Sequence, residues 1–136
     1  MSTKLTGLAA ACGVLLAAPA WGHHSFTAEF DRTKVVNIEG TIVKMEWVNP
    51  HAWIHVSVKN PDGTSTVWMI EGNTPNGLLR RGFTKKSLEP GTEVAIKGYM
   101  AKSGDYKANG SSMTFKDGRK LFLGSSSGDE EPKDGK

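Results

Sequence analysis

The chain has 136 residues, enough for one domain but not for two. Its 17 Lys and Arg face 14 Asp and Glu, a formal net charge of +3, which is too small to argue for binding to nucleic acid or to a membrane surface. Cys12 is the single cysteine and lies in an apolar N-terminal segment. After removal of that segment, no disulfide can brace the domain and no thiolate can bind metal.

Residues 1–22 have the features of a secretory signal peptide. Lys4 supplies the positive start, and the apolar run of about 11–13 residues is shorter than the roughly 20 that span a bilayer. Small residues place cleavage before His23, and an alternative site precedes Trp21. Loss of Lys4 leaves 16 basic against 14 acidic residues. We therefore expect a periplasmic or secreted monomer with no membrane anchor after cleavage and no nucleic-acid partner.

Residues 23–34 are expected to form an N-terminal arm, either as one helical turn or as an extended segment. Phe26 and Phe30 stand four residues apart, and we expect both rings to pin the arm to the domain, since buried aromatic rings contribute large apolar contacts.

Residues 35–123 carry the strand and turn signals of one small β domain. Gly40 is expected to allow a bend or bulge in the first strand. A hairpin turn is expected at 60–63, and a short helix capped by Thr74 is expected to bury Leu78 and Leu79 and to stop at Gly82. The expected strands span residues 35–47, 52–59, 64–71, 92–101, 111–115 and 120–123.

This element order predicts a mainly β fold, specifically a small OB-fold-like barrel of five to six strands with one short helix between strands three and four. A six-stranded open roll is the main alternative. Residues 124–136 are rich in Ser, Gly and charged residues and are expected to form a disordered tail.

Several short segments resemble those of a family of small exported bacterial proteins of unknown function. The resemblance covers nearly all of the chain after the signal peptide and is specific in the two histidine stretches. It implies a periplasmic or secreted protein and no particular activity. The segments are His23-His24-Ser25-Phe26, Glu29-Phe30-Asp31, Gly40-Thr41-Ile42, Glu46 to Ile54, Trp68, Leu78 to Gly82, Leu88 to Gly91, Gly98-Tyr99 and Asp117 to Phe122.

Histidine placement at the processed N-terminus predicts a metal site, with copper as first choice. Imidazole binds copper, zinc and nickel, and divalent copper stands at the top of the affinity order. With cleavage before His23, the α-amine and imidazole of His23 chelate one ion, and a third histidine completes a T-shaped copper site. With cleavage before Trp21, His23 becomes the third residue of a square-planar Cu(II) or Ni(II) site.

The third ligand is predicted to be His51, at the Asn49–Pro50 turn where a flexible arm can reach it. Four strand residues separate His51 from His55 by roughly 13 Å, so one ion cannot bind both. His55 and Trp53 are expected to line the approach, and His24 alternates with His23. The competing interpretation is that the terminal histidines are solvated and that His51 caps the turn.

A second hypothesis is a metal-free OB-like module that binds a small ligand or a periplasmic protein partner. Exposed aromatic rings often mark binding surfaces, and Trp53 with Trp68 would provide one here. No nucleophile elbow or phosphate-binding loop occurs, so no enzyme is predicted. The remaining methionines after the signal peptide are interpreted as core residues: Met45, Met69, Met100 and Met113.

Overall fold

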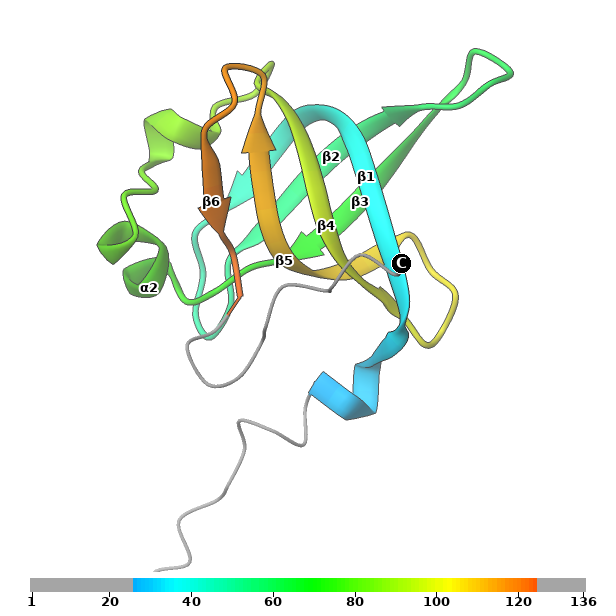
Figure 1. The fold of residues 1–136 in the computed structure, drawn as a ribbon, viewed down its shortest axis with the longest axis horizontal. Helices are drawn as coiled ribbons and strands as arrows, with labels where there is room; N and C mark the ends of the chain where they lie inside the picture. The colour runs from blue at the N-terminus through cyan, green and yellow to red at the C-terminus, as the bar shows by residue number, and fades with distance from the viewer. Residues whose placement is uncertain (1–25, 125–136) are drawn as a thin grey trace, which may run out of the picture.

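The structure is a computed structural model that describes residues 26–124. In this part of the chain, six strands form one sheet, and residues 26–29 are helical. The protein is therefore mainly β, as the sequence predicts (Figure 1). The elements are β1 (Phe30–Glu46), β2 (Trp53–Lys59), β3 (Ser65–Glu71), α2 (Pro75–Arg80), the 3-10 helix η1 (Lys85–Leu88), β4 (Glu93–Ala101), β5 (Lys107–Phe115) and β6 (Lys120–Phe122).

The strands lie in the order β3-β2-β1-β4-β5-β6, and each neighbouring pair is antiparallel. An additional parallel pairing joins β3 to β5, with Ile70 opposite Ala108. The pairings therefore lead from β1 through β2, β3, β5 and β4 back to β1. This circuit brings the end of β3 beside the start of β5.

The long strand β1 pairs with β4 along its first part and with β2 along its second part. The sequence predicts a bend or bulge at Gly40, and the register shift with β2 lies two residues later, between Ile42 and Lys44. Gly40 itself permits a close approach, because a Cβ there would lie 2.2 Å from the carbonyl oxygen of Ser57. β1 also begins at Phe30, inside the segment expected to form the arm.

The core lies on one face of the sheet, which we call the inner face. Period-two alternation in β2 is confirmed, since Ile54 and Val56 are fully buried whereas Trp53 and His55 point to the opposite, outer face. The inner-face core is one cluster of apolar side chains: Ile38, Ile42, Ala52, Ile54, Val56, Ile70, Leu78, Phe83, Leu88, Val94, Ile96, Ala108, Met113, Phe115 and Leu123.

Helix α2 begins as the sequence predicts, because the Thr74 hydroxyl accepts a hydrogen bond from the Gly77 N–H at 3.0 Å. Gly82 follows the helix with φ of +86°, a conformation that favours glycine at a helix stop. Leu78 is fully buried, but the expectation for Leu79 is wrong, since it is 52% exposed. Adjacent residues of a helix point about 100° apart, so the face of α2 that buries Leu78 turns Leu79 away from the core.

Among the described residues, no helix is long and apolar enough to cross a membrane. The predicted signal peptide and nearly all of the predicted tail lie outside the described residues.

Candidate metal-binding region

His51 lies between the Asn49–Pro50 turn and the start of β2. Its Nδ1 is 3.2 Å from the carbonyl oxygen of Gly72 and 3.3 Å from Oε1 of Glu71. Both oxygens are acceptors, so in the neutral ring Nδ1 carries the proton and Nε2 keeps its lone pair. The ring is thus oriented by the end of β3, with Nε2 available as a ligand.

Backbone hydrogen bonds hold this turn against the chain that follows β3. The Ala52 N–H donates to the Asn73 carbonyl at 3.0 Å, and the Gly72 N–H donates to the Ala52 carbonyl at 2.8 Å. His51 and Glu71 differ in solvent exposure: the Glu71 side chain is 10% exposed, and the His51 side chain is 37% exposed. The carboxylate is shielded, and the imidazole that it contacts remains accessible.

His55 lies within β2, four residues after His51, and its neighbours differ from those of His51. Its side chain is 15% exposed, and its buried Nε2 has no hydrogen-bond partner among the described residues. Glu46 Oε2 is 3.6 Å away, beyond hydrogen-bond distance. Glu46 accepts a hydrogen bond from Lys44 instead, and this bond, with the smaller influence of His55, holds the pKa of Glu46 below its usual value.

Met69 stands directly across from His55 in the antiparallel β2–β3 pair. The prediction that Met69 belongs to the core is wrong, because its side chain points to the outer face and is 37% exposed. Met113 is fully buried, as expected. The sheet therefore presents an imidazole and a thioether side by side on its outer face.

The two tryptophans proposed as a shared aromatic surface lie on opposite faces of the sheet. Trp53 pairs with Glu71 on the outer face. Trp68 pairs with Val56 and packs against the inner-face core, with its ring edge-on to Tyr106 at 5.4 Å between centroids. The pair does not form one aromatic patch.

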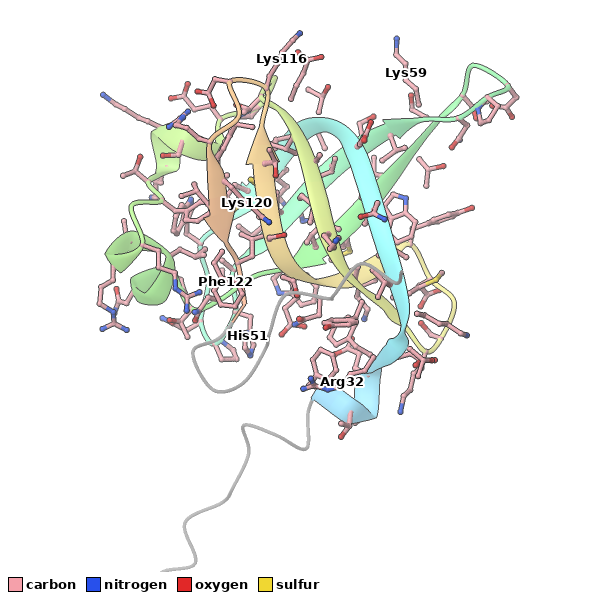
Figure 2. The ribbon with its side chains drawn as sticks, in the orientation of Figure 1. Arg32, His51, Lys59, Lys116, Lys120 and Phe122 are labelled. Carbon is pink, nitrogen blue, oxygen red and sulfur yellow. The ribbon has the colours of Figure 1, made fainter. Side chains whose placement is uncertain are left out.

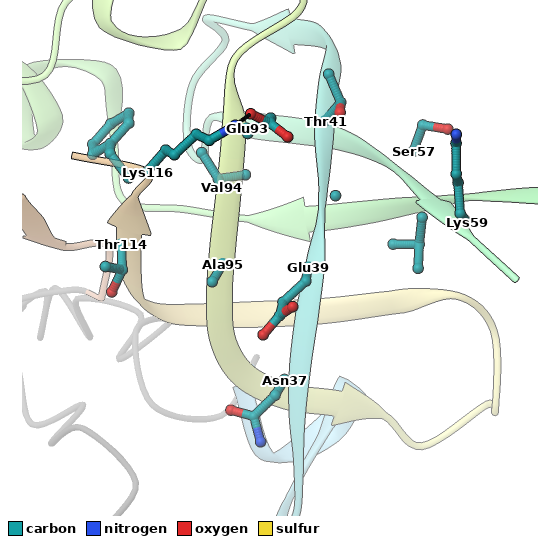
Figure 3. A pocket seen from close by; sticks show the side chains of 13 residues that line it. Asn37, Glu39, Thr41, Ser57, Lys59, Glu93, Val94, Ala95, Thr114 and Lys116 are labelled. Atoms are coloured by element: carbon teal, nitrogen blue, oxygen red, sulfur yellow. Dashed lines mark hydrogen bonds and ion pairs between the residues drawn. The ribbon is translucent and has the colours of Figure 1, made fainter. Parts of the chain in front are cut away.

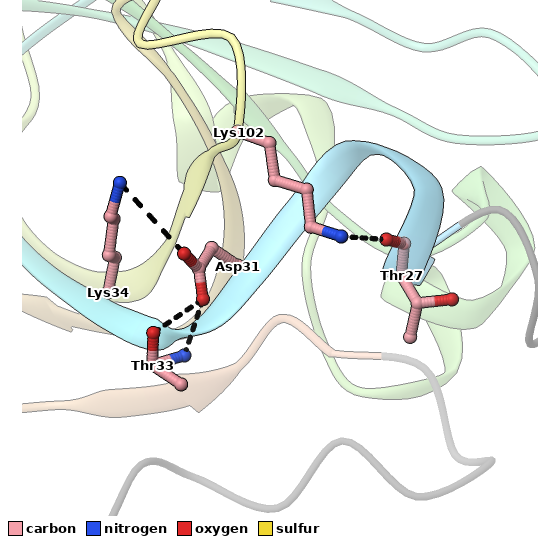
Figure 4. A network of polar contacts seen from close by, with 5 residues as sticks. All are labelled: Thr27, Asp31, Thr33, Lys34 and Lys102. Atoms are coloured by element: carbon pink, nitrogen blue, oxygen red, sulfur yellow. Dashed lines mark hydrogen bonds and ion pairs between the residues drawn. The ribbon is translucent and has the colours of Figure 1, made fainter.

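His23 and His24 lie outside the described residues, but the segment that follows them is anchored to the sheet. The Phe26 ring packs against Phe30 and meets Tyr99 edge-on, with centroids 5.6 and 5.7 Å apart. Lys102 donates to the Thr27 carbonyl (Figure 4). The expectation that both Phe rings pin the arm is confirmed.

Further polar contacts fix the entry into β1. Asp31 accepts hydrogen bonds from the Thr33 hydroxyl and N–H at 2.6 and 2.9 Å, which hold the pKa of Asp31 below its usual value (Figure 4). Glu29 pairs with Lys107 at the start of β5. In Figure 2, His51 and Arg32 both lie at the end of the sheet that carries this anchored segment.

A separate groove of about 860 Å³ crosses β1 away from His51 (Figure 3). Its wall includes Glu39, Thr41, Ser57 and Lys59. Glu93 lies on its edge and pairs with Lys116 at 2.6 Å, a contact that keeps the pKa of Lys116 above its usual value. This groove is polar and contains no histidine.

No group of three His, Cys, Asp or Glu side chains that could hold a metal occurs within residues 26–124. The structure brings His51 to Glu71 and His55 to Met69, but it does not bring the two histidines to one point. Glu71 and Met69 were missed by the sequence analysis. The alternation in β3 could have placed both on the outer face, although only the hairpin register shows which residues they oppose.

The model of a family of unknown function (DUF6152) matches residues 12–111. The chain belongs to this family. The DUF6152 match includes all four histidines together with Met69 and Glu71. It ends before the segment 117–122, which also contributes to the family resemblance. No curated protein and no solved structure matched the chain.

Proposed function

We propose that this protein is exported to the periplasm or secreted and binds Cu(II) through its processed N-terminal histidine, with His51 as the third nitrogen ligand. The observation that carries this proposal is the fixed imidazole of His51. Ligating histidines commonly donate their other ring N–H to a carboxylate or carbonyl, which orients the ring and raises its basicity. Here Nδ1 contacts the Gly72 carbonyl and Glu71 Oε1, and the side chain remains accessible.

The chain length between His23 and the sheet supports a shared site. Phe26 packs on Tyr99, and the strand pairs lead from Tyr99 to Asn109 and from Asn109 to Glu71, which contacts His51. Two strand spacings of about 4.8 Å separate Tyr99 from Glu71. Three extended residues span about 10 Å, a length of the same order as this separation. The contacts of Phe26 with Tyr99 and of Glu71 with His51 add to the path, and the long side chains at both ends help to cover it.

Copper fits this set of ligands better than other divalent ions. An α-amine and two imidazoles offer three nitrogen atoms, and Cu(II) binds nitrogen ligands most tightly in the divalent series. In this proposal, the processed N-terminus supplies the other two nitrogen ligands.

The test is a Cu(II) titration with EPR on the exported, processed protein, whose intact mass identifies the first residue. With His23 first, we expect one-to-one, nitrogen-rich binding that His51→Ala weakens by about 100-fold or more, since loss of an outer-shell partner alone costs 10–100-fold. His55→Gln serves as the matched control and should leave Cu(II) affinity unchanged. Affinity that neither His51→Ala nor His23→Ala alters would reject the proposal.

Processing before Trp21 gives a different expectation. The amine, two amides and His23 would then hold Cu(II) in a square plane, and His51→Ala would have no effect. The intact mass and the His51→Ala result together therefore distinguish the two geometries.

We also assign the sheet to an OB-like barrel. The circuit of pairings through β1, β2, β3, β5 and β4 and the placement of α2 between β3 and β4 support this assignment. Amide NOEs between Ile70 and Ala108 in solution would test the closing pair β3–β5. Their absence would favour an open roll.

The alternative function is that of a metal-free module that binds a small ligand or a protein partner. The groove across β1 favours it, because about 860 Å³ falls within the range of small-molecule sites. A fragment screen by NMR should then shift the amides of Glu39, Thr41 and Ser57. Shifts confined to other parts of the sheet would exclude the groove.

A further inference from the structure

The outer face of the β2–β3 hairpin places His55 directly opposite Met69. Directly opposed residues of an antiparallel pair have Cβ atoms about 4.5–5.5 Å apart. An imidazole and a thioether at this separation can both contact one small ion between them. Neither residue takes part in the Cu(II) site proposed above.

His55 Nε2 is the atom that calls for an explanation. It is buried and has no hydrogen-bond partner among the described residues. Buried polar atoms are almost always paired, because an unpaired one loses its hydration without compensation. A polar neighbour of Nε2 is Oε2 of Glu46, at 3.6 Å, whereas Oε1 of that carboxylate accepts a hydrogen bond from Lys44. With the ring proton on Nδ1, Nε2 has a lone pair, and Met69 lies opposite His55 on β3.

The charges around this pair suit a monovalent ion. Lys44 pairs with His55 across β1–β2, and Lys107 pairs with Met69 across β3–β5. Each lysine is balanced by a carboxylate, Lys44 by Glu46 and Lys107 by Glu29. The row of four residues thus has little net charge, and the carboxylate near Nε2, that of Glu46, is paired with Lys44 through its other oxygen.

Trp53 adds an aromatic ring on the same face. It lies two residues before His55 on β2, about 6.7 Å along the strand, and therefore on the same side of the sheet. An indole face attracts cations within about 6 Å of its centroid. The ring can cover an ion held between His55 and Met69.

We propose that His55 Nε2 and Met69 Sδ form a second, separate site for a soft monovalent metal ion, Cu(I), with the Trp53 ring beside it. Imidazole nitrogen and thioether sulfur favour Cu(I), whereas hard divalent ions prefer oxygen. This site would be additional to the proposed Cu(II) site and does not depend on it. It involves no change in oxidation state, because each site binds its own ion.

The probe is Ag(I), an air-stable monovalent substitute for Cu(I), added to the processed full chain. We expect one equivalent to bind and to shift the Met69 methyl signal in ¹³C-methionine NMR spectra. Met69→Leu keeps the shape but removes the sulfur, and it should weaken Ag(I) binding by about 100-fold. The matched control is Met100→Leu, at a half-buried methionine on β4, which should leave the affinity unchanged.

His55→Gln should reduce Ag(I) affinity to a similar extent as Met69→Leu. Ag(I) affinity that remains within threefold of wild type in Met69→Leu would overturn the proposal. So would Ag(I) binding that leaves the Met69 methyl signal of the unmodified protein in place, a result independent of how any variant folds. His51→Ala should retain the Met69 shift, so failure of the Cu(II) proposal and failure of this one are distinguishable.

Discussion

His51 and His55 stand four residues apart in the chain, yet their surroundings differ. We call His51, Glu71 and Gly72 the turn region, and His55, Met69 and Trp53 the strand region. In the turn region, Nδ1 is held by two oxygens and the ring is accessible. In the strand region, Nε2 is buried, has no partner within hydrogen-bond distance and lies 3.6 Å from Glu46 Oε2, while Met69 stands opposite His55. The same side chain is oriented as a nitrogen ligand at one position and set among soft groups at the other.

The difference comes from backbone geometry rather than from residue type. His51 precedes β2, so its ring reaches the chain that follows β3, where a carbonyl oxygen and a carboxylate are available. His55 is inside β2, where its neighbours are side chains of the adjacent strands: Lys44 and Met69 opposite, and Glu46 diagonally at 3.6 Å. In the two proposed sites, a position at the end of a strand and a position within it therefore present different sets of ligands.

The largest expected effect comes from making the strand region resemble the turn region. Met69→His replaces the thioether with a second imidazole opposite His55. We expect the preference for Ag(I) over Zn(II) to fall by about 100-fold or more, because the ligand pair changes from mixed to all-nitrogen. Parallel titrations with both ions measure this ratio. An unchanged ratio would show that Met69 does not contact the ion.

Glu71→Gln should weaken the turn region alone. The substitution keeps the shape but removes the carboxylate that contacts His51 Nδ1, so Cu(II) affinity should fall by about 10–100-fold. Ag(I) affinity should not change. The matched control is Glu46→Gln, which removes a carboxylate near His55 instead. Equal Cu(II) affinities in the two variants would argue against an orienting role for Glu71.

Phe26→Ala tests whether the anchored segment presents His23 to His51. Loss of the contacts with Phe30 and Tyr99 should lower the free energy of unfolding by about 1–3 kcal/mol, less than for a fully buried ring. Cu(II) affinity should fall by about tenfold, because the effective concentration of the N-terminal ligands decreases. Thermal unfolding and titration measure both effects. An unchanged affinity in the destabilised variant would separate the anchor from metal binding.

The smallest effect concerns Glu46 and acid. The pKa of Glu46 is held below its usual value of 4.5, chiefly by the hydrogen bond from Lys44. The ionised carboxylate therefore stabilises the fold in full above pH 4.5. That contribution is lost as pH falls through the lowered pKa. The difference in Tm between wild type and Glu46→Gln should therefore be present at pH 7 and vanish in strong acid. A difference that persists there would point to packing rather than charge.

Local sequence patterns were sufficient to predict much of the fold. Alternation along residues 52–59, the glycine at 63 and the cap at Thr74 depend on near neighbours, and each is present in the structure. The parallel pairing of β3 with β5 depends on residues far apart in the chain, which no local pattern records. The exposure of Leu79 likewise depends on where the short helix rests.

The candidate site was less predictable for the same reason. His51 stood out because it follows a turn signal, but its partner Glu71 lies 20 residues later at the end of an apolar strand. Met69 looked like a core residue because it lies among Val, Trp and Ile in β3. Only the register of the hairpin shows that it faces His55.

The turn between β2 and β3 has a consequence for how such proteins diverge. Hydrogen bonds between Asn60 and Thr64 close the turn, and the length of a hairpin turn sets the register of its strands. A one-residue change in that length would place Trp68 or Ile70 opposite His55 and direct Met69 towards the core. Relatives that keep both the histidine and the methionine would then differ in the side chain that faces the histidine, through a turn about 17 Å away along the strand.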